Sequence, residues 1–431
     1  MAGHITIERM SETIQTIRGM HDVLPEQAHA WEYFEDTVRD WLRAYGYRQI
    51  RMPVLEKTEL FVRGIGEVTD IVEKEMYSFV DQLDGEGLTL RPEGTASCMR
   101  AVVQHNLMHT GAQRLFYMGP MFRHERPQKG RYRQFHQVGV ETVGYTGPDI
   151  DAEHLIMAAR LWQRLGIEGL RLQINTLGSS AARARYRARL IAYLQSVETQ
   201  LDEDSRRRMH RNPLRVLDSK NPAMAPVIEA APQLAQDLDD DSVAAFDLLQ
   251  SLLIQAGVAF EVNPRLVRGL DYYNDAVYEW ITDRLGAQAA VCAGGRYDGL
   301  VPQIGGKPTP ACGYAMGVER LLALMEDAGR LPAAAAADVY LVHAGEQARA
   351  LAWPVAEKLR DNGVTTVLHC GGGSFKSQMK RADASGARYA VIIGDDEAAR
   401  QEVAVKALRA QQEQQNLPVA EAIALLAAKA K

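Results

Sequence analysis

The sequence predicts an α+β fold: an antiparallel sheet flanked by helices, interrupted by a helical insertion and followed by a smaller α/β domain. Three observations support this fold class. Two apolar runs within residues 114–143 flank a polar loop that contains Pro127 and Gly130, which predicts a long antiparallel hairpin. Residues 179–258 are helical in pattern and rich in charge. After an alanine run at residues 333–337, short apolar strands alternate with helical patterns, as in α/β domains.

The first domain is expected to open with a helix. Apolar residues recur at three- and four-residue steps over residues 31–45, and Gly46 follows as a helix stop. A proline then closes the next apolar segment, as at the end of a strand. The further strands of this domain are expected at residues 47–53, 88–91, 115–118 and 132–143, with a helix from about Ala96.

The last domain is expected to hold a mostly parallel sheet, because its apolar runs are separated by helical patterns. Its strands are predicted at residues 339–342, 364–368 and 389–393. A length of 431 residues suits two or three domains of about 150 residues each. The predicted domains are residues 1–178 with 259–331, the insertion 179–258, and residues 338–431.

Composition excludes several classes of protein. Hydrophobic residues make up 46% and charged residues 24%, which are globular values. No apolar run approaches eighteen residues and the N-terminus has no signal-like apolar segment, so we expect a soluble, cytoplasmic protein with no membrane partner. The four cysteines form no C-x-x-C pair, so all are expected to be reduced, buried thiols.

The formal charge of −6 argues against binding nucleic acid through bulk positive charge. Residues 123–137, however, hold five basic residues and one acid. Since side chains two apart share a face of a strand, Phe135, Gln137 and Glu141 should face one way and His136 the other. Two interpretations stay open: a half-solvated strand, or a polar pocket floor beside a phosphate-binding arginine.

Three further clusters carry arginine beside glycine. Residues 265–274 bring Arg268 and Gly269 close to an acid and two tyrosines, and residues 292–299 form a glycine-rich turn. Arg320 stands in the first turn of a predicted helix, where the helix dipole disfavours a cation unless an anionic ligand lies there. Each cluster alone is more often a structural turn or an exposed helix face.

Two motifs resemble ligand sites without matching them. His105 and His109 have the spacing of a helical metal pair, but no glutamate completes H-E-x-x-H and no third ligand is evident, so no metal site is predicted. The segment 371–376 is glycine-rich between a strand and a helix. This segment does not match the Walker pattern of ATP-binding loops, so the one phosphate site it still allows is a nest of backbone N–H groups.

Taken together, the clusters resemble the class II aminoacyl-tRNA synthetases and, closely, the bacterial histidyl-tRNA synthetase family. The three class II motifs are matched at residues 46–53, 121–135 and 317–321. Arg-Leu-Val-Arg-Gly-Leu-Asp-Tyr-Tyr (265–273) and Gly-Gly-Arg-Tyr-Asp-Gly (294–299) resemble the two histidine-specific signatures. Residues 18–22, 90–95 and 371–376 also resemble segments of this family. The likeness runs from Ile14 to the end, with His21 where the family usually has asparagine.

The resemblance implies ATP-dependent ligation of L-histidine to tRNA(His) through a histidyl-adenylate, with release of AMP and pyrophosphate. It implies that Arg123 holds the α-phosphate and the substrate carboxylate, with Glu125 beside it in the ATP site. Arg320 would grip the γ-phosphate, and Arg268 would reach the α-phosphate from the other side. Magnesium would bridge the β- and γ-phosphates, without assigned protein ligands. Catalysis should then rest on positioning and charge neutralisation.

The resemblance also implies a histidine pocket. Glu93, Gly94, Thr95 and Gln137 would receive the α-amino group. Glu141 and Tyr273, with Tyr272 alongside, would read the imidazole, which offers one donor and one acceptor.

Partners follow from the same likeness: tRNA(His), and a second copy of the chain in a homodimer. Arg126, Gln128 and Lys129 in the hairpin loop would face the acceptor end of tRNA, and residues 338–431 would bind the anticodon region. The arginine-rich start of the insertion has two interpretations, a clasp for the acceptor stem or a solvated helix face.

The main alternative for the whole chain is a non-catalytic paralogue that binds histidine as a signal. Such proteins lack the last domain and lose the ATP-binding arginines, which this sequence retains.

Overall fold

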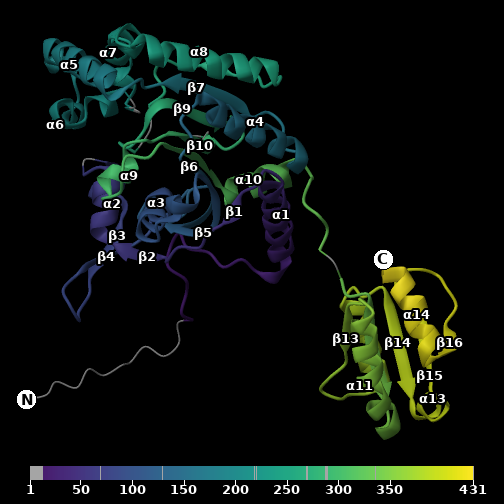
Figure 1. The fold of residues 1–431 in the computed structure, drawn as a ribbon. Coiled ribbons are helices and arrows are strands. Elements are labelled where there is room, and N and C mark those ends of the chain that lie inside the picture. Colours follow the sequence, from purple (N-terminus) through teal and green to yellow (C-terminus); the bar gives the residue numbers. More distant parts are fainter. Residues whose placement is uncertain are drawn as a thin grey trace, which may run out of the picture. The chain divides into compact units, whose positions relative to one another are not determined.

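The computed structural model describes residues 13–67, 69–128, 130–217, 219, 221–267, 270–286, 290–334 and 336–430. The chain forms two compact units, residues 1–332 and 333–431, and the boundary between them falls at the start of the alanine run (Figure 1). Among the described residues, no helix is long and apolar enough to cross a membrane.

The first unit is built on an eight-stranded, largely antiparallel sheet in the order β1-β5-β6-β11-β10-β9-β7-β8. Only the pairs at its edges, β1 with β5 and β7 with β8, are parallel. Its strands are β1 Arg48–Gln49, β5 Gln113–Phe122, β6 Gln134–Val143, β7 Arg171–Thr176, β8 Glu261–Val262, β9 Asn274–Ile281, β10 Ala290–Arg296 and β11 Ala311–Gly317.

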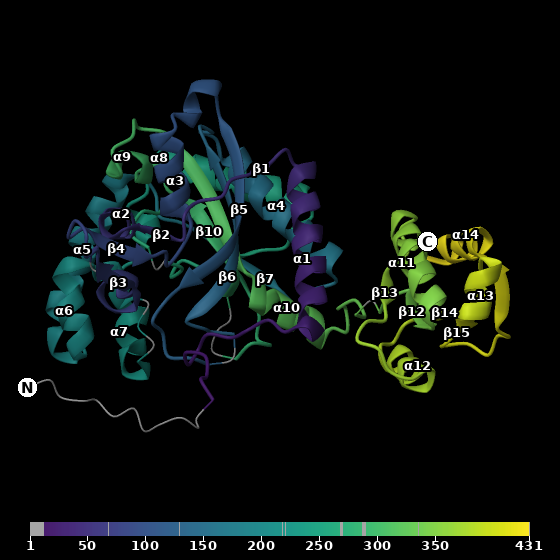
Figure 2. The same ribbon diagram turned by 90° about the horizontal axis from the view of Figure 1, so that it is seen from below.

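Helices cover both faces of this sheet. One core joins it to α1 Pro25–Ala44, α4 Pro148–Leu165 and α10 Val318–Asp327. A second core lies on the opposite face, under α3 Thr95–Gln104 and helices from the predicted insertion. Figure 2 shows α1 and α10 on one side of the sheet and α3 on the other. A small sheet in the order β2-β4-β3 adjoins α2 Thr58–Ile65; its strands are β2 Leu55–Lys57, β3 Tyr77–Val80 and β4 Gly87–Leu90.

The described part of the predicted insertion consists of helices joined by short turns and loops. Its elements are α5 Ser180–Ser196, α6 Glu203–Arg211, α7 Ala225–Ala230 and α8 Asp240–Gln255, with 3-10 turns Glu198–Gln200, Pro213–Val216, Pro222–Met224 and Leu234–Gln236 between them. Helix α8 contacts α4 and contributes Leu249 and Leu253 to the first core. The segment therefore shares core with the sheet. The short elements that remain in this unit are the π-helix Ile71–Glu75, the 3-10 helix Leu107–Thr110 and α9 Leu300–Gln303.

The second unit holds a five-stranded sheet in the order β13-β12-β14-β15-β16. Its strands are β12 Val339–Ala344, β13 Thr366–Leu368, β14 Tyr389–Gly394, β15 Glu402–Ala407 and β16 Gln415–Pro418; its helices are α11 Glu346–Asp361, α12 Phe375–Ala384, α13 Asp395–Arg400 and α14 Val419–Ala430. The prediction of a mostly parallel sheet is only half right, because β15 and β16 are antiparallel. Residues 395–401 between β14 and β15 are too few for the crossover of a dozen or more residues that a parallel pair needs.

Several element boundaries differ from those predicted. Helix α1 begins at Pro25, upstream of residue 31, since a proline at the first helical position is already set for a helix. The strand expected at residues 47–53 is confined to β1. Beyond it, the carbonyls of Met52 and Pro53 accept hydrogen bonds from the Arg91 guanidinium, at 3.1 and 3.4 Å, so they do not continue the sheet. The hairpin prediction is confirmed: residues 113–122 pair with residues 143–134.

The four cysteines are all free, but they are not all buried. Cys98, Cys292 and Cys312 lie in the interior of the first unit, as expected. Cys370 is exposed, because it follows β13 at the start of the glycine-rich loop instead of lying within a strand.

Candidate active site

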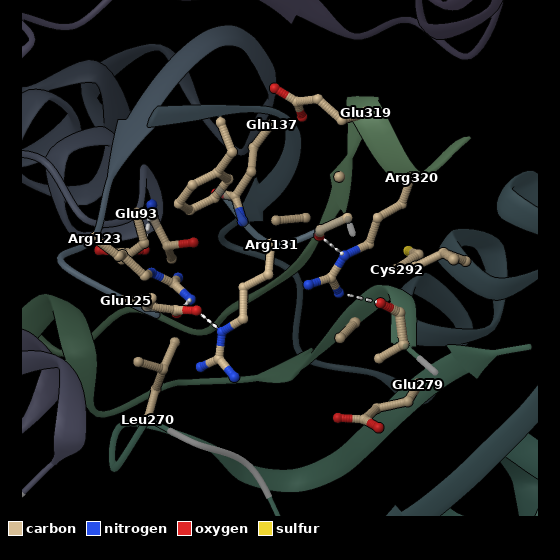
Figure 3. A pocket seen from close by; sticks show the side chains of 18 of the residues that line it. Glu93, Arg123, Glu125, Arg131, Gln137, Leu270, Glu279, Cys292, Glu319 and Arg320 are labelled. Atoms are coloured by element: carbon tan, nitrogen blue, oxygen red, sulfur yellow. Dashed lines mark hydrogen bonds and ion pairs between the residues drawn. The ribbon is translucent and has the colours of Figure 1, made fainter. Parts of the chain in front are cut away.

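A cavity of about 310 Å³ opens on the face of the large sheet that carries α3. Its walls come from the start of α3, from β6, β9, β10 and β11, and from the loop of the β5–β6 hairpin (Figure 3). The polar side chains that line it are those of Glu93, Thr95, Arg123, Glu125, Arg131, Tyr132, Gln137, Tyr272, Tyr273, Glu279, Cys292, Glu319 and Arg320. Clusters that are far apart in the sequence therefore meet in one place.

Glu93 lies in front of the first turn of α3. Its carboxylate accepts the backbone N–H groups of Thr95 and Ala96, at 2.6 and 2.9 Å. A negative charge at this end of a helix is favoured by the helix dipole and by the unpaired N–H groups. Burial nevertheless raises the pKa of Glu93 above its ordinary value. Glu93 is thus a rigidly held acid at the edge of the cavity.

Glu141, on β6, is completely buried and does not itself line the cavity, but it contacts the lining residue Thr95. One carboxylate oxygen accepts the hydroxyls of Thr95 at 2.8 Å and Tyr117 at 3.0 Å, and the other accepts the hydroxyl of Tyr297. Burial raises the pKa of Glu141 to about 8, although the three hydroxyl donors oppose this rise. The fold therefore holds one acidic group with its orientation fixed before any ligand arrives.

Tyr117 fits between two glycines. A Cβ on Gly94 would lie 2.2 Å from its ring, and a Cβ on Gly139 would lie 2.0 Å from it. Because no side chain fits at either position, the ring stays close to the backbone of α3 and β6. Gly94 thus leaves the space that the Tyr117 ring occupies, and its place in the histidine site stays a prediction.

Two arginines are held by backbone carbonyls on opposite sides of the cavity. Arg123 Nε donates to the carbonyl of Pro92 at 2.8 Å, and its guanidinium lies 5.2 Å from the centre of the Phe135 ring. Arg320 Nε donates to the carbonyl of Gly130 at 2.8 Å, and its Nη1 donates to that of Ala290.

Three guanidinium groups lie together in the cavity, among four carboxylates that also line it. Burial lowers the pKa of Arg320, and the positive charges of Arg123 and Arg131 lower it further. Figure 3 shows these three side chains directed toward the same space. Grouped guanidinium groups of this kind suit an anion such as a phosphate chain.

The hairpin loop is tied to its surroundings. Arg131 forms an ion pair with Glu125, and the N–H of His124 donates to the carbonyl of Glu75 at 2.7 Å. Arg126 and Gln128 are exposed in this loop and do not line the cavity. Lys129, Arg268 and Gly269 lie outside the described residues. The roles predicted for Lys129 and Arg268 therefore rest on the sequence and stay predictions.

The alternation predicted for β6 is confirmed. Phe135 and Gln137 line the cavity, while Val138 and Val140 lie in the core on the other side and His136 lines a different cavity. The amide oxygen of Gln137 is buried without a hydrogen-bond partner among the residues that the structure describes. Tyr272 and Tyr273 are buried at the cavity wall, with ring centres 4.6 Å apart.

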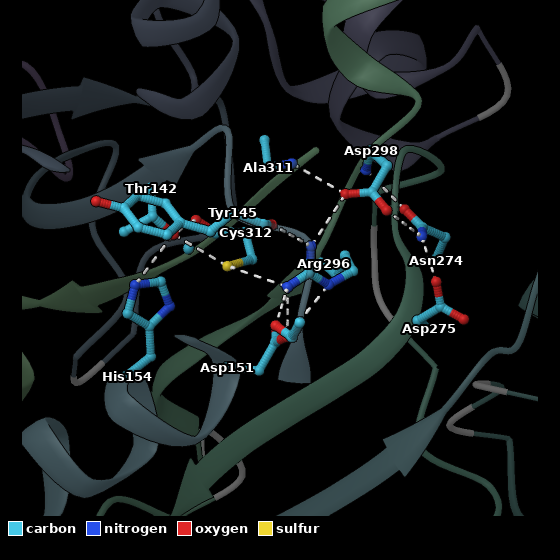
Figure 4. Close-up of polar contacts among 12 residues, drawn as sticks. Thr142, Tyr145, Asp151, His154, Asn274, Asp275, Arg296, Asp298, Ala311 and Cys312 are labelled. Carbon is cyan, nitrogen blue, oxygen red and sulfur yellow. Dashed lines mark hydrogen bonds and ion pairs between the residues drawn. The ribbon is translucent and has the colours of Figure 1, made fainter. Parts of the chain in front are cut away.

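The side chains of the Gly-Gly-Arg-Tyr-Asp-Gly segment (294–299) point in two directions. Arg296 forms a buried ion pair with Asp151 of α4 and also contacts Asp298 at 3.3 Å (Figure 4). A Cβ on Gly294 would lie 2.2 Å from the carbonyl of Gly313, so the close approach that this glycine permits is to a neighbouring strand and not to a ligand. Tyr297 points the other way, to Glu141.

Sequence reasoning missed Tyr117, Tyr297 and Glu319 as parts of the site. Tyr297 had a signal, since it lies inside a histidine-family signature. Glu319 had one too, since it lies inside the third class II motif, although its partner His136 on β6 is 183 residues away in the chain. Tyr117 had none, because its contact with Glu141 appears only when β5 and β6 are paired. In the described part of the chain, no group of three or more His, Cys, Asp or Glu residues could hold a metal ion by itself.

Residues 19–321 match the family described as Histidyl-tRNA synthetase, and residues 338–429 match the family described as Anticodon binding domain. The chain is 62% identical over 417 residues to the Histidine--tRNA ligase of Nitrosomonas europaea, covering 97% of this chain and 99% of that one.

Solved structures agree with this likeness. The crystal structure of apo Staphylococcus aureus histidyl-tRNA synthetase superposes with a TM-score of 0.82 at 32% identity, over 96% of this chain and 100% of that one. An ATP phosphoribosyltransferase regulatory subunit/histidyl-tRNA synthetase from Bacillus halodurans shares the fold, with a TM-score of 0.64 at 22% identity over 89% and 99% of the two chains.

Proposed function

The chain belongs to the histidyl-tRNA synthetase family, and from this premise we propose how its cavity performs the reaction of that family. The protein is a class II aminoacyl-tRNA synthetase that joins L-histidine to tRNA(His) in an ATP-dependent reaction through a histidyl-adenylate. The observation that carries the proposal is one cavity that brings together Glu93, Arg123 and Arg320, with the buried Glu141 hydrogen-bonded to Thr95 at its wall.

The first step must bring two anions together. The carboxylate of histidine attacks the α-phosphate of ATP, so their repulsion has to be cancelled where they meet. We assign this to Arg123, which lies between the Glu93 side of the cavity and the hairpin loop. Arg320, on the opposite side, would grip the γ-phosphate, and Arg268 remains a proposal from the family signature. Planar guanidinium forks suit phosphate oxygens better than a lysine point charge does.

Histidine would bind at the Glu93 end. Two acceptors suited to an ammonium group line this end: the carboxylate of Glu93, and the amide oxygen of Gln137, which has no hydrogen-bond partner in the described part of the chain. The imidazole would reach Glu141, with Tyr272 and Tyr273 at the wall. A site built on buried hydrogen bonds rejects analogues that lack them by about 10⁴–10⁵-fold.

ATP would enter as its magnesium complex. Magnesium keeps several waters and is held by substrate phosphates together with one or two carboxylates. The cavity fits such a complex, because Glu279 lines it beside Arg320. The ion would help to neutralise the β- and γ-phosphates, while the residues of the chain orient the α-phosphate.

The tRNA would contact two places. The exposed Arg126 and Gln128, with Lys129 next to them, would meet the acceptor end beside the cavity mouth. Residues 338–429 match an anticodon-binding domain and would meet the anticodon region. Residues 179–258 remain proposed as an insertion domain near the acceptor stem.

We also propose a homodimer and a cytoplasmic location. Residues 46–53 resemble the first class II motif, which in that family helps to form the dimer interface, and an exposed apolar surface lies on the small sheet that begins just after them. Leu55 and Phe79 share a face of the small sheet by its register, and Val80 and Leu83 are 65% and 95% exposed nearby. A second copy of the chain is the occupant that this position favours.

The test is ATP–pyrophosphate exchange with purified protein. Exchange should depend on L-histidine and on magnesium, and other amino acids should support none. Arg123→Ala should abolish exchange, whereas the matched loop variant Arg126→Ala should keep exchange and lose efficiency only when tRNA is charged. Absence of histidine-dependent exchange would falsify the proposed function.

A further inference from the structure

Behind Arg320 lies a contact between the large sheet and α10 that the reaction does not itself require. In the ladder between β6 and β11, the last paired residues are Gln137 and Gly317. The chain then leaves the sheet, because α10 begins at Val318. The backbone N–H of His136 is therefore left without the next strand residue as its partner.

The carboxylate of Glu319 takes that place. The N–H of His136 donates to its two oxygens, at 2.8 and 3.0 Å, and the imidazole Nδ1 of the same histidine contacts one of them at 2.9 Å. Since a carboxylate only accepts, Nδ1 carries the proton in this contact. One residue of β6 thus holds one carboxylate of α10 through both its backbone and its side chain.

The imidazole itself is enclosed by a third element. The ring of Trp31, on α1, meets it edge-on, with ring centres 4.9 Å apart. The His136 side chain is 27% exposed and that of Glu319 is 16% exposed, so the pair is largely shielded from water. Hydrogen bonds to a charged group are stronger where water is excluded.

This contact lies between two cavities. Glu319 lines both the cavity of the proposed reaction and a second one of about 640 Å³ behind it, where His136 also lies. Arg320 follows Glu319 directly in the first turn of α10 and extends into the first cavity. The orientation of that turn therefore sets where the guanidinium of Arg320 points.

We propose that His136 is a positioning residue that, through Glu319, fixes the first turn of α10 against β6 and so directs Arg320 toward ATP. The inference rests on the proposed role of Arg320 in binding ATP. His136 itself touches no substrate, since its side chain lies on the far face of β6 from the reaction cavity.

The test compares His136→Asn with His136→Gln and His136→Ala in histidine-dependent ATP–pyrophosphate exchange. The amide nitrogen of asparagine stands where Nδ1 of histidine stands, whereas that of glutamine lies one bond farther out. We expect the KM for ATP to rise about tenfold in the Gln and Ala variants and to stay within about twofold of wild type in the Asn variant. The KM for histidine should stay within about twofold in all three.

Three outcomes would overturn the inference: an Asn variant as impaired as the Gln variant, an unchanged KM for ATP in all three, or a parallel rise of both KM values with a lowered Tm. If the Ala variant fails to fold, the Asn and Gln pair decides alone. Arg320→Ala is measured alongside. A wild-type KM for ATP in that variant contradicts the role of Arg320 and the inference with it. A raised KM there, with indifferent His136 variants, contradicts only the inference.

Discussion

The phenol of Tyr297 donates a hydrogen bond to the carboxylate of Glu141 across the intervening strand β11. Both side chains are buried, so the bond links a histidine-family signature to the acid that is proposed to contact the imidazole. The neighbouring residues Arg296 and Asp298 are fixed by other contacts, and they leave the tyrosine little freedom to turn away.

Tyr297→Phe should therefore weaken histidine selection. The variant keeps the ring and removes one donor from a buried acid, and leaving such a group short of a donor costs about 1–3 kcal/mol. We expect the KM for histidine in pyrophosphate exchange to rise about tenfold and the KM for ATP to change less than twofold.

Tyr314→Phe is the matched control for that change. Tyr314 is a buried tyrosine on β11 whose hydroxyl has no hydrogen-bond partner among the described residues. Its removal should leave both KM values near wild type. If the two Phe variants behave alike, the Tyr297–Glu141 bond does not contribute to histidine binding.

Glu141 should make the stability of the unliganded protein depend on pH. Its pKa is about 8 in the folded chain and 4.5 ordinarily, so between these values the folded state holds a proton that the unfolded state has lost. Stability from this group is therefore full below about pH 4.5 and is lost as pH rises to about 8. Glu141→Gln imitates the protonated acid and should gain Tm relative to wild type between pH 5.5 and pH 8.5. A Tm difference that stays constant over this range would show that Glu141 titrates near its ordinary value.

Asp151→Asn should destabilise the first unit strongly. The change leaves the guanidinium of Arg296, which is 5% exposed, without its buried counter-charge. Removing one partner of such a pair costs about 3–5 kcal/mol. Asp283→Asn breaks the exposed 2.9 Å pair with Arg171 and should cost about 0–1 kcal/mol. Urea unfolding followed by circular dichroism compares the two, and equal losses would contradict the structural role of Arg296.

Gly313→Ala should disturb Glu141 from the neighbouring strand. A Cβ at this position would lie 1.9 Å from a Glu141 carboxylate oxygen and 2.4 Å from the carbonyl of Val140. Forcing a methyl group into such a packed place costs about 1–3 kcal/mol, and we expect the KM for histidine to rise as the carboxylate shifts. Gly299→Ala is the control, since its Cβ meets nothing closer than 3.9 Å. Wild-type histidine kinetics in Gly313→Ala would argue against a fixed Glu141.

Local patterns in the sequence predicted much of the fold. The alternation of polar and apolar residues over 134–143 predicted both the hairpin strand and the face that carries Gln137. It could do so because successive side chains of a strand point to opposite faces of the sheet. The strand expected at residues 47–53 was shortened by Arg91, which lies in a different segment and takes the carbonyls that a sheet would have used. The direction of β15 depended on connection length, which apolar runs alone do not encode.

The site was also predictable only in part, because several of its contacts join segments that are far apart in the chain. Glu93, Arg123, Gln137 and Arg320 stand in recognisable motifs and meet in one cavity. The contact between His136 and Glu319 joins residues 183 positions apart, and no spacing rule connects them. The position of Tyr117 depends on the two glycines that make room for its ring, and it becomes visible only when the strands are in place.

The distribution of thiols provides a way to observe the second unit on its own. Three of the four cysteines are buried in the first unit, and only Cys370, in the second, is exposed. A maleimide dye or spin label added to the native protein should therefore attach at a single position, without any engineered cysteine. The attached probe would report on tRNA binding at residues 338–429, while the first unit, which carries no label, remains free to catalyse the reaction.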